Sequence, residues 1–129
     1  MDSGGIRRRL ALGMAVLAAS GALALVAPGS AQAADGSCAG HRVKSLPFST
    51  GTVQVYRSDG YVCAVTLTKN PGVRRSMSVS VQARGNRPVV DKGRYMHRAG
   101  PVTVHAGHRC VWVKGSVGGG SVSSGWILC

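Results

Sequence analysis

The residues best suited to chemistry lie in one stretch, Gly93 to Cys110, which contains three of the four histidines of the chain and no carboxylate. Paired imidazoles can hold zinc or exchange protons. His105 and His108 are three residues apart, and on a β-strand such side chains point to opposite faces unless a turn at Gly107 brings them together. The nearest carboxylate in the sequence, Asp91, lies outside the stretch. The spacing therefore argues against a metal site, and we expect no cofactor.

Acid and base side chains for hydrolysis are scarce. After residue 33 the sequence has three Asp, four His and no Glu, which excludes hydrolases that use paired glutamates. No Gly-x-Ser-x-Gly motif precedes a helical pattern, so a serine triad is not indicated. A secreted nuclease or toxin that uses two histidines and a basic clamp stays open as an alternative, although no spacing places two histidines opposite each other. We expect no catalytic residue and a protein that is not an enzyme.

Positive charge is the more prominent signal. Residues 34–129 carry thirteen Lys and Arg against three Asp, a net charge of +10 with neutral histidines. Such a charge attracts polyanions, and arginine, which outnumbers lysine nine to four there, has a planar fork that suits phosphate, sulfate and carboxylate groups. The alternative is a basic surface that serves only solubility. The candidate polyanion-binding residues are Arg74, Arg75, Arg84, Arg87, Arg94, Arg98, His105 and Arg109.

The first thirty-three residues have the features of an export signal. Residues 7–9 are three arginines, residues 10–27 form an apolar run, and residues 31–33 are a small-residue cleavage site of the Ala-x-Ala type. A retained membrane anchor is the alternative, but Gly, Ser and Pro interrupt the run. We expect cleavage after Ala33, which leaves one secreted domain over residues 34–129 with no transmembrane segment.

Four cysteines, Cys38, Cys63, Cys110 and Cys129, lie in this domain. An even number in an exported chain predicts two disulfides, for which three pairings are possible. We favour the sequential pairing, Cys38 with Cys63 and Cys110 with Cys129, because each closes a short loop between neighbouring strand segments. A zinc site is disfavoured because no Cys-x-x-Cys pair is present.

The chain from Thr52 onward alternates apolar and polar residues with the period of two that is typical of β-strands. Asp59-Gly60 predicts a tight hairpin, and residues 76–83 form the clearest strand, with Met and Val expected inside. We expect Cys63 to point inward, residues 91–93 to form a turn, and residues 116–125 to form a Gly/Ser-rich loop. The sequence thus predicts an all-β fold, a small antiparallel sandwich or barrel of six to seven short strands stabilised by two disulfides.

Several stretches, taken together, resemble one family. These are the four cysteines, "GTVQVY" at 51–56, "DGYVCAVTL" at 59–67, "DKGRYMHRAGPVTVHAGHRCV" at 91–111 and "SGWILC" at 124–129. In this order they resemble the secreted spore-associated proteins of filamentous actinobacteria. The resemblance implies a small exported protein that associates with the spore or aerial cell surface, with no assigned catalytic activity. The chain is far more basic than that family, and no functional residue is carried over.

We therefore expect a non-enzymatic, secreted, basic protein of the spore or cell surface, whose partners are anionic wall or spore polymers and not a specific nucleic acid. The alternatives are the secreted nuclease or toxin, and a small protease-inhibitor-like scaffold that presents Arg74 and Arg75 in the loop of residues 72–76. The sequence does not define the oligomeric state.

Overall fold

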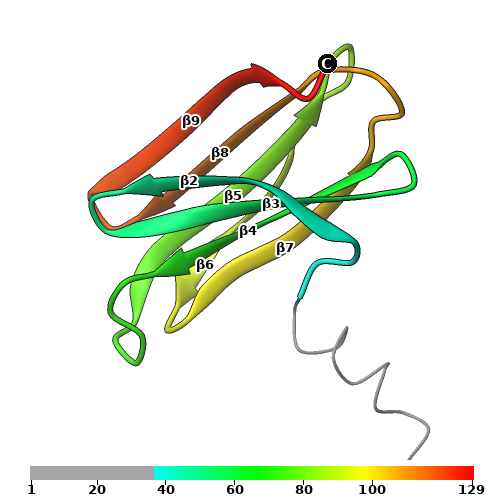
Figure 1. Ribbon diagram of the computed structural model, residues 1–129. Coiled ribbons are helices and arrows are strands. Elements are labelled where there is room, and N and C mark those ends of the chain that lie inside the picture. Colours follow the sequence, from blue (N-terminus) through cyan, green and yellow to red (C-terminus); the bar gives the residue numbers. More distant parts are fainter. Residues whose placement is uncertain (1–36) are drawn as a thin grey trace, which may run out of the picture. The chain divides into compact units, whose positions relative to one another are not determined.

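The computed structural model describes residues 37–129, which form two four-stranded antiparallel sheets packed face to face (Figure 1). One sheet has the strand order β2-β3-β4-β7 and the other the order β6-β5-β8-β9. The expected export signal lies outside the described residues. Among residues 37–129 there is no helix that could cross a membrane. The strands are β2 (His41–Phe48), β3 (Gly51–Ser58), β4 (Tyr61–Thr68), β5 (Arg75–Ala83), β6 (Val89–Tyr95), β7 (Arg98–His105), β8 (Val111–Val117) and β9 (Gly120–Ile127).

The core lies between the sheets and is built mostly from valine. Alternation along β5 buries Met77, Val79, Val81 and Ala83, as the sequence predicts, while the intervening serines face outward. Each fully buried valine contributes about 1.5–3 kcal/mol relative to an exposed one. The valines of the other strands that are buried to 1% exposure or less are Val53, Val55, Val62, Val111, Val113 and Val117.

One polar side chain is fully buried in this core. Thr66 on β4 donates a hydrogen bond of 2.9 Å from its hydroxyl to the carbonyl of Ser78 on β5, and so satisfies a group that would otherwise be costly to bury. Gly115 on β8 makes room for it, because a Cβ at this position would overlap the side chains of Val53 and Thr66. The two sheets therefore approach closely at Thr66.

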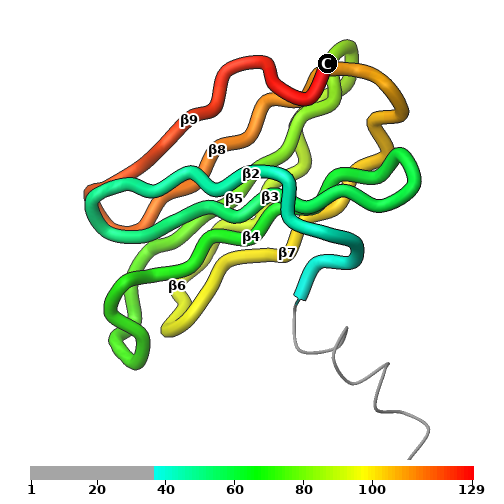
Figure 2. The backbone as a smooth tube through the Cα atoms, viewed as in Figure 1, coloured from blue at the N-terminus to red at the C-terminus, as the bar shows by residue number. Residues whose placement is uncertain are grey.

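Three tight hairpins set the strand register, and the first joins β2 to β3 through residues 49 and 50, because Phe48 is paired with Gly51. Asp59 and Gly60 both have positive φ, 47° and 81°, and join β3 to β4 in the predicted two-residue turn. Gly118 and Gly119 join β8 to β9 in another two-residue turn, in which only Gly118 has a positive φ, 57°, because Val117 is paired with Gly120. Figure 2 shows the β8–β9 hairpin beside the turn between β2 and β3, where the hydroxyl of Thr50 donates a hydrogen bond of 2.7 Å to the carbonyl of Val117. It also shows the C-terminal end close to the turn that follows β5.

Both disulfides form with the favoured pairing, Cys38–Cys63 and Cys110–Cys129. The orientation expected for Cys63 was wrong. Val62 and Ala64 face the core, so Cys63 lies on the outer face of its sheet. It is nevertheless only 6% exposed, because the segment at Cys38 crosses that face and is bonded to it.

The predicted all-β class is confirmed, but the number of strands was too low: there are eight, not six to seven. Residues 91–93 do not form a turn, because they lie inside β6 and pair with β5. Residues 116–125 do not form a loop either, since they contain the end of β8, a hairpin turn and most of β9. The strand over residues 41–48 was not expected at all.

Candidate functional site

A hollow of about 320 Å³ lies at the corner where β6 passes to β7, and basic residues surround it. The connection between these strands is only two residues long, Met96 and His97, and it crosses from one sheet to the other. Backbone hydrogen bonds hold it: Thr68 N–H donates to the carbonyl of His97, and Gly72 N–H to that of Met96. The residues that line the hollow are Arg74, Arg94, Tyr95, Met96, His97 and Arg98.

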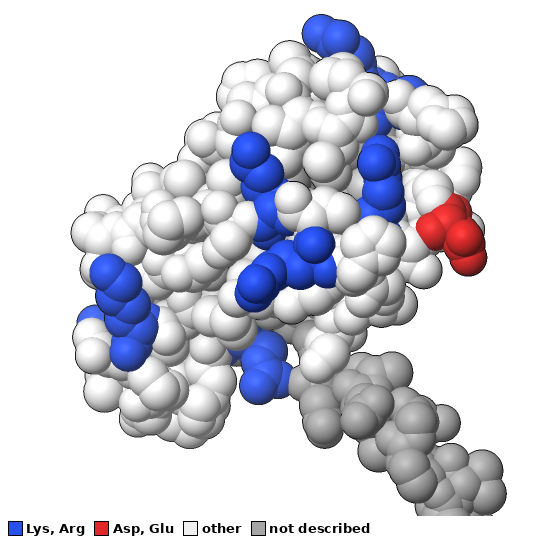
Figure 3. All heavy atoms as spheres, in the orientation of Figure 1, with Lys and Arg blue, Asp and Glu red and all other residues white. Residues whose placement is uncertain are grey.

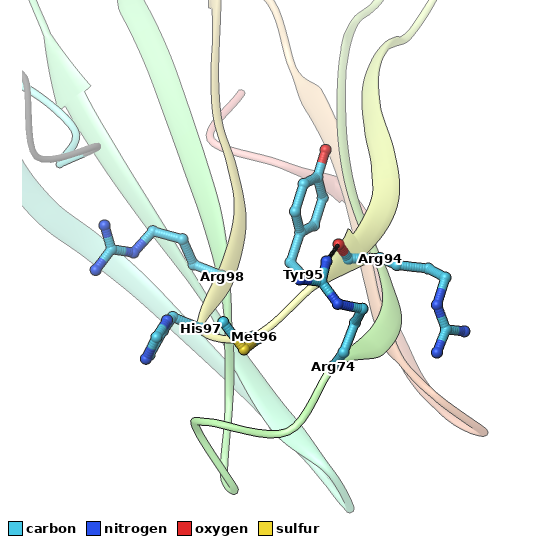
Figure 4. A pocket seen from close by; sticks show the side chains of 6 residues that line it. All are labelled: Arg74, Arg94, Tyr95, Met96, His97 and Arg98. Carbon is cyan, nitrogen blue, oxygen red and sulfur yellow. Dashed lines mark hydrogen bonds between the residues drawn. The ribbon is translucent and has the colours of Figure 1, made fainter.

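The side chains of this corner do not converge on one point (Figure 4). Arg74 lies across the connection and donates a hydrogen bond of 3.2 Å to the carbonyl of Arg94. The Arg94 side chain points to one side, whereas His97 and Arg98 point to the other. The corner can attract an anion by charge, but its arginines do not form the two-pronged clamp that binds a phosphate or carboxylate specifically.

The opposite end of the sandwich holds Arg109, whose guanidinium is committed to backbone carbonyls. It donates to Ala106 at 3.0 Å, to His105 at 2.8 Å and to Arg84 at 3.4 Å. These contacts tie the turn after β7 to the end of β5. Arg109 is therefore mainly a structural residue, although its side chain is exposed.

Arg84 and Arg75 each lie beside an aromatic residue. The Arg84 guanidinium lies over the ring of Trp126, 4.9 Å from its centroid, in a cation–π contact. Arg75 is half-buried at the start of β5, opposite Tyr95, and its buried Nε makes no hydrogen bond within the described chain. Arg87 is exposed in the turn between β5 and β6.

The candidate residues are therefore divided between the two ends of the sandwich, with Arg74, Arg94 and Arg98 at the corner and Arg84, His105 and Arg109 at the opposite end. Arg74 and Arg84 flank the extended strand β5, which places them about 30 Å apart. Charges that far apart act independently, because the Debye length is about 8 Å at physiological ionic strength. On the face shown in Figure 3, Lys and Arg form separate spots with uncharged surface between them.

The histidines are also distributed. The exposed ring of His105 meets Tyr61 edge to face, with ring centroids 4.9 Å apart. His108 instead lines a hollow of about 420 Å³ with Arg57 and Asp59. No group of three potential metal ligands is found among residues 37–129. Gly107, which lies between the two histidines, has the positive φ of a turn, 60°. The two histidines nevertheless have different neighbours.

Asp91 is a polar residue whose role the sequence did not indicate. Its carboxylate accepts hydrogen bonds from the hydroxyl of Tyr95, at 2.6 Å, and from the N–H of Gly100, at 2.7 Å. The hydrogen bond to Asp91 favours the neutral phenol, and together with desolvation and the charge of Asp91 it raises the pKa of Tyr95 above its ordinary value. Asp91, one of the two carboxylate side chains in residues 37–129, is therefore engaged in hydrogen bonds within the fold.

A second surface was missed because part of it, residues 116–125, was expected to be a loop. The outer face of β5, β8 and β9 carries Trp112, Lys114 and a group of serines around a hollow of about 450 Å³. The signal was present in the alternation of serine with valine over residues 116–117 and 121–123. The high glycine content of the segment concealed it.

Comparison of the chain with protein-family models, with curated proteins and with solved structures finds no match.

Proposed function

We propose that the protein is an exported, non-enzymatic β-sandwich that adheres to anionic polymers of a spore or cell surface through charge spread over its exterior. One observation carries the proposal. Residues 37–129 contain thirteen Lys and Arg but only two carboxylates, Asp59 and Asp91, and Asp91 is occupied by Tyr95 and Gly100. Two disulfides are typical of proteins that work in oxidising, extracellular surroundings. The resemblance to spore-associated proteins supports the spore as the location.

The arrangement of the cations favours a long polymer over a small anion. The corner at Arg74 and the end at Arg84 are too far apart for one small ligand, but a polymer can contact both. Diffuse charge attraction of this kind requires no built pocket and weakens steeply with salt. Wall and spore polymers that carry phosphate or carboxylate groups have the required length and sign.

Retention on isolated cell walls tests the proposal. The mature protein is expected to bind walls at low ionic strength and to be released as salt rises toward molar concentration, because screening removes the attraction. Retention that does not change over this range would exclude charge as its cause.

Two matched double variants distinguish diffuse charge from a dedicated basic site. Arg74→Gln with Arg94→Gln removes two charges at the corner, whereas Arg42→Gln with Lys44→Gln removes two from the exposed strand β2. Diffuse attraction predicts an equal loss of wall affinity for the two variants. A loss about tenfold larger for the corner variant would instead identify the corner as the binding site.

The other functions considered have less support. A nuclease needs histidines that converge, and His105 and His108 contact different neighbours. A protease-inhibitor loop needs an arginine that is free to enter a protease pocket, whereas the exposed Arg74 donates a hydrogen bond to the carbonyl of Arg94 and Arg75 is half-buried. Incubation with RNA tests the nuclease, and incubation with trypsin-like proteases tests the inhibitor. Cleavage of RNA or stoichiometric inhibition would overturn the proposed function in favour of that activity.

A further inference from the structure

The outer face of β5, β8 and β9 is rich in serine. The strand registers place Ser78, Ser116 and Ser121 in one row, and Ser80, Lys114 and Ser123 in the next. Gln82 and Trp112 form the row that follows. We refer to this surface as the serine face, defined by Ser78, Ser80, Trp112, Lys114, Ser116, Ser121 and Ser123.

The serine face is hollowed because short side chains lie beside one large one. A depression of about 450 Å³ lies over four of its serines, with Trp112 and Lys114 in its lining. The hydroxyls of Ser78 and Ser116 share a hydrogen bond of 2.6 Å. Each serine hydroxyl can both donate and accept, so the floor can serve a ligand that carries hydroxyl groups of its own.

Trp112 is held rigidly at one end of this depression. Its indole N–H donates a hydrogen bond of 2.7 Å to the hydroxyl of Ser123. Its ring also meets Trp126 edge to face, with centroids 5.3 Å apart and an angle of 89° between the rings. Trp126 is fixed in turn by the guanidinium of Arg84. A large aromatic surface that is fixed before binding costs little conformational entropy when a ligand packs on it.

The charge of the face is positive. Lys114 lies exposed in its middle, and the exposed Lys92 extends the row of Ser78. The carboxylate of Asp91 does not reach this surface, because it is bonded to Tyr95 and Gly100 on the other side of β6. The face thus offers hydroxyls, one aromatic platform and ammonium groups to a ligand.

We propose that the serine face binds an acidic polysaccharide. The apolar C–H face of a sugar ring packs on Trp112, sugar hydroxyls exchange hydrogen bonds with the serines, and a uronate carboxylate pairs with Lys114. Of the two neighbouring tryptophans only Trp112 lines the depression, and the guanidinium of Arg84 lies over the ring of Trp126. One available ring is a poor fit to single-stranded nucleic acid, whose binding proteins stack successive bases on several aromatic side chains. This inference rests on the proposed function. It identifies the anionic polymer of that proposal as a polysaccharide. Diffuse charge attracts the polymer, and the serine face selects it.

Two exposed serines provide a matched test. Ser121→Glu places a negative charge on the serine face, whereas Ser45→Glu places the same charge on β2 of the other sheet. Both positions are exposed, so neither variant disturbs the core. Binding of the mature protein to immobilised alginate, a polyuronate, is measured for the unmodified chain and the two variants, with neutral dextran, polyphosphate and single-stranded DNA as competitors.

We expect Ser121→Glu to lower alginate affinity about tenfold or more and Ser45→Glu to change it by less than about threefold. Free alginate competes, whereas dextran, polyphosphate and DNA at equal charge or mass compete weakly. Trp112→Ala is expected to lower affinity similarly, and Trp112→Phe to retain much of it, in variants whose circular dichroism is unchanged.

Equal losses for the two glutamate variants would overturn the serine face as the site. Competition by polyphosphate or DNA as strong as that by alginate would overturn the saccharide as the ligand. Both outcomes leave wall retention, and with it the proposed function, intact. Failure of the unmodified protein to bind walls at low salt is a separate result, which rejects the proposed function.

Discussion

The carboxylate of Asp91 on β6 accepts a hydrogen bond of 2.7 Å from the backbone N–H of Gly100 on β7. Because β6 and β7 belong to different sheets, this bond joins the two layers along one side of the sandwich. The other oxygen of Asp91 accepts the bond from Tyr95, so a single carboxylate links three positions.

Asp91→Ala is expected to lower the free energy of unfolding by about 1–3 kcal/mol, because it leaves the N–H of Gly100 without its acceptor. Urea unfolding measures the loss. Asp59→Asn is the matched control, since it changes the net charge equally and asparagine tolerates the positive φ of this hairpin position. Equal losses in the two variants would show that charge, and not the hydrogen bond, is responsible.

Tyr95 makes the free energy of unfolding depend on pH in the alkaline range. Its pKa is raised in the folded protein, so the folded chain holds this proton at pH values where the unfolded chain has lost it. The contribution of Tyr95 is therefore complete below pH about 10, the pKa of an unperturbed tyrosine, and is lost as pH rises through the folded value. Phenolate absorbance should show a late-titrating component that is absent from Tyr95→Phe. In Asp91→Asn that component should shift to lower pH, and its persistence there would remove Asp91 as the cause.

Loss of the Cys110–Cys129 bond should destabilise the protein by about 3 kcal/mol in the chain-entropy model. The paired change of both cysteines to serine also frees the end of β9, which carries Trp126. Tryptophan fluorescence is expected to shift toward longer wavelength as Trp126 loosens from Trp112. The Cys38–Cys63 bond closes a loop of similar length on the other sheet, and the paired change of these two cysteines to serine should lower stability without this spectral shift.

Gly115→Ala should be strongly destabilising, by about 2–4 kcal/mol, because the new Cβ collides with Val53 and Thr66 between the sheets. Gly119→Ala is the control, since a Cβ there meets nothing within 4 Å. Thermal unfolding compares the two. A similar melting temperature for both variants would mean that the sheets can separate at this point without cost.

Local patterns were sufficient to predict the features that depend on neighbouring residues. The alternation from Met77 to Ala83, the Asp59-Gly60 hairpin and the sequential disulfides follow from side-chain period, turn chemistry and loop length. The all-β class follows from the same patterns. The route by which these strands assemble into sheets is not local, and it was not predicted.

The errors have a physical cause in tertiary contacts. Gly93 resembles a turn residue, yet it lies inside β6, where it pairs with Met77 of β5. Cys63 has the strand parity of surface residues, and only the covering segment at Cys38 buries it. Both depend on residues brought close by the fold.

The candidate site was predicted by residue type but not by arrangement. Arginine and histidine were correctly identified as abundant, yet their distances depend on strand order. The nine residues of β5 hold Arg74 and Arg84 far apart because the strand is extended, whereas Arg109 reaches Arg84 across twenty-five positions of sequence. The serine face needs three strands in register, β5, β8 and β9, and no single segment displays it.

The outermost strands of the sandwich limit self-association. β2 lies against β9, and β6 against β7, so each sheet edge is partly covered by the other sheet. The pairing of β2 also shifts register between Arg42 and Lys44, and these exposed cations flank the irregularity. Irregular, charged edges are poor templates for a strand from a second molecule. Copies crowded together along a polyanion would therefore remain separate molecules and would not be expected to grow into fibres.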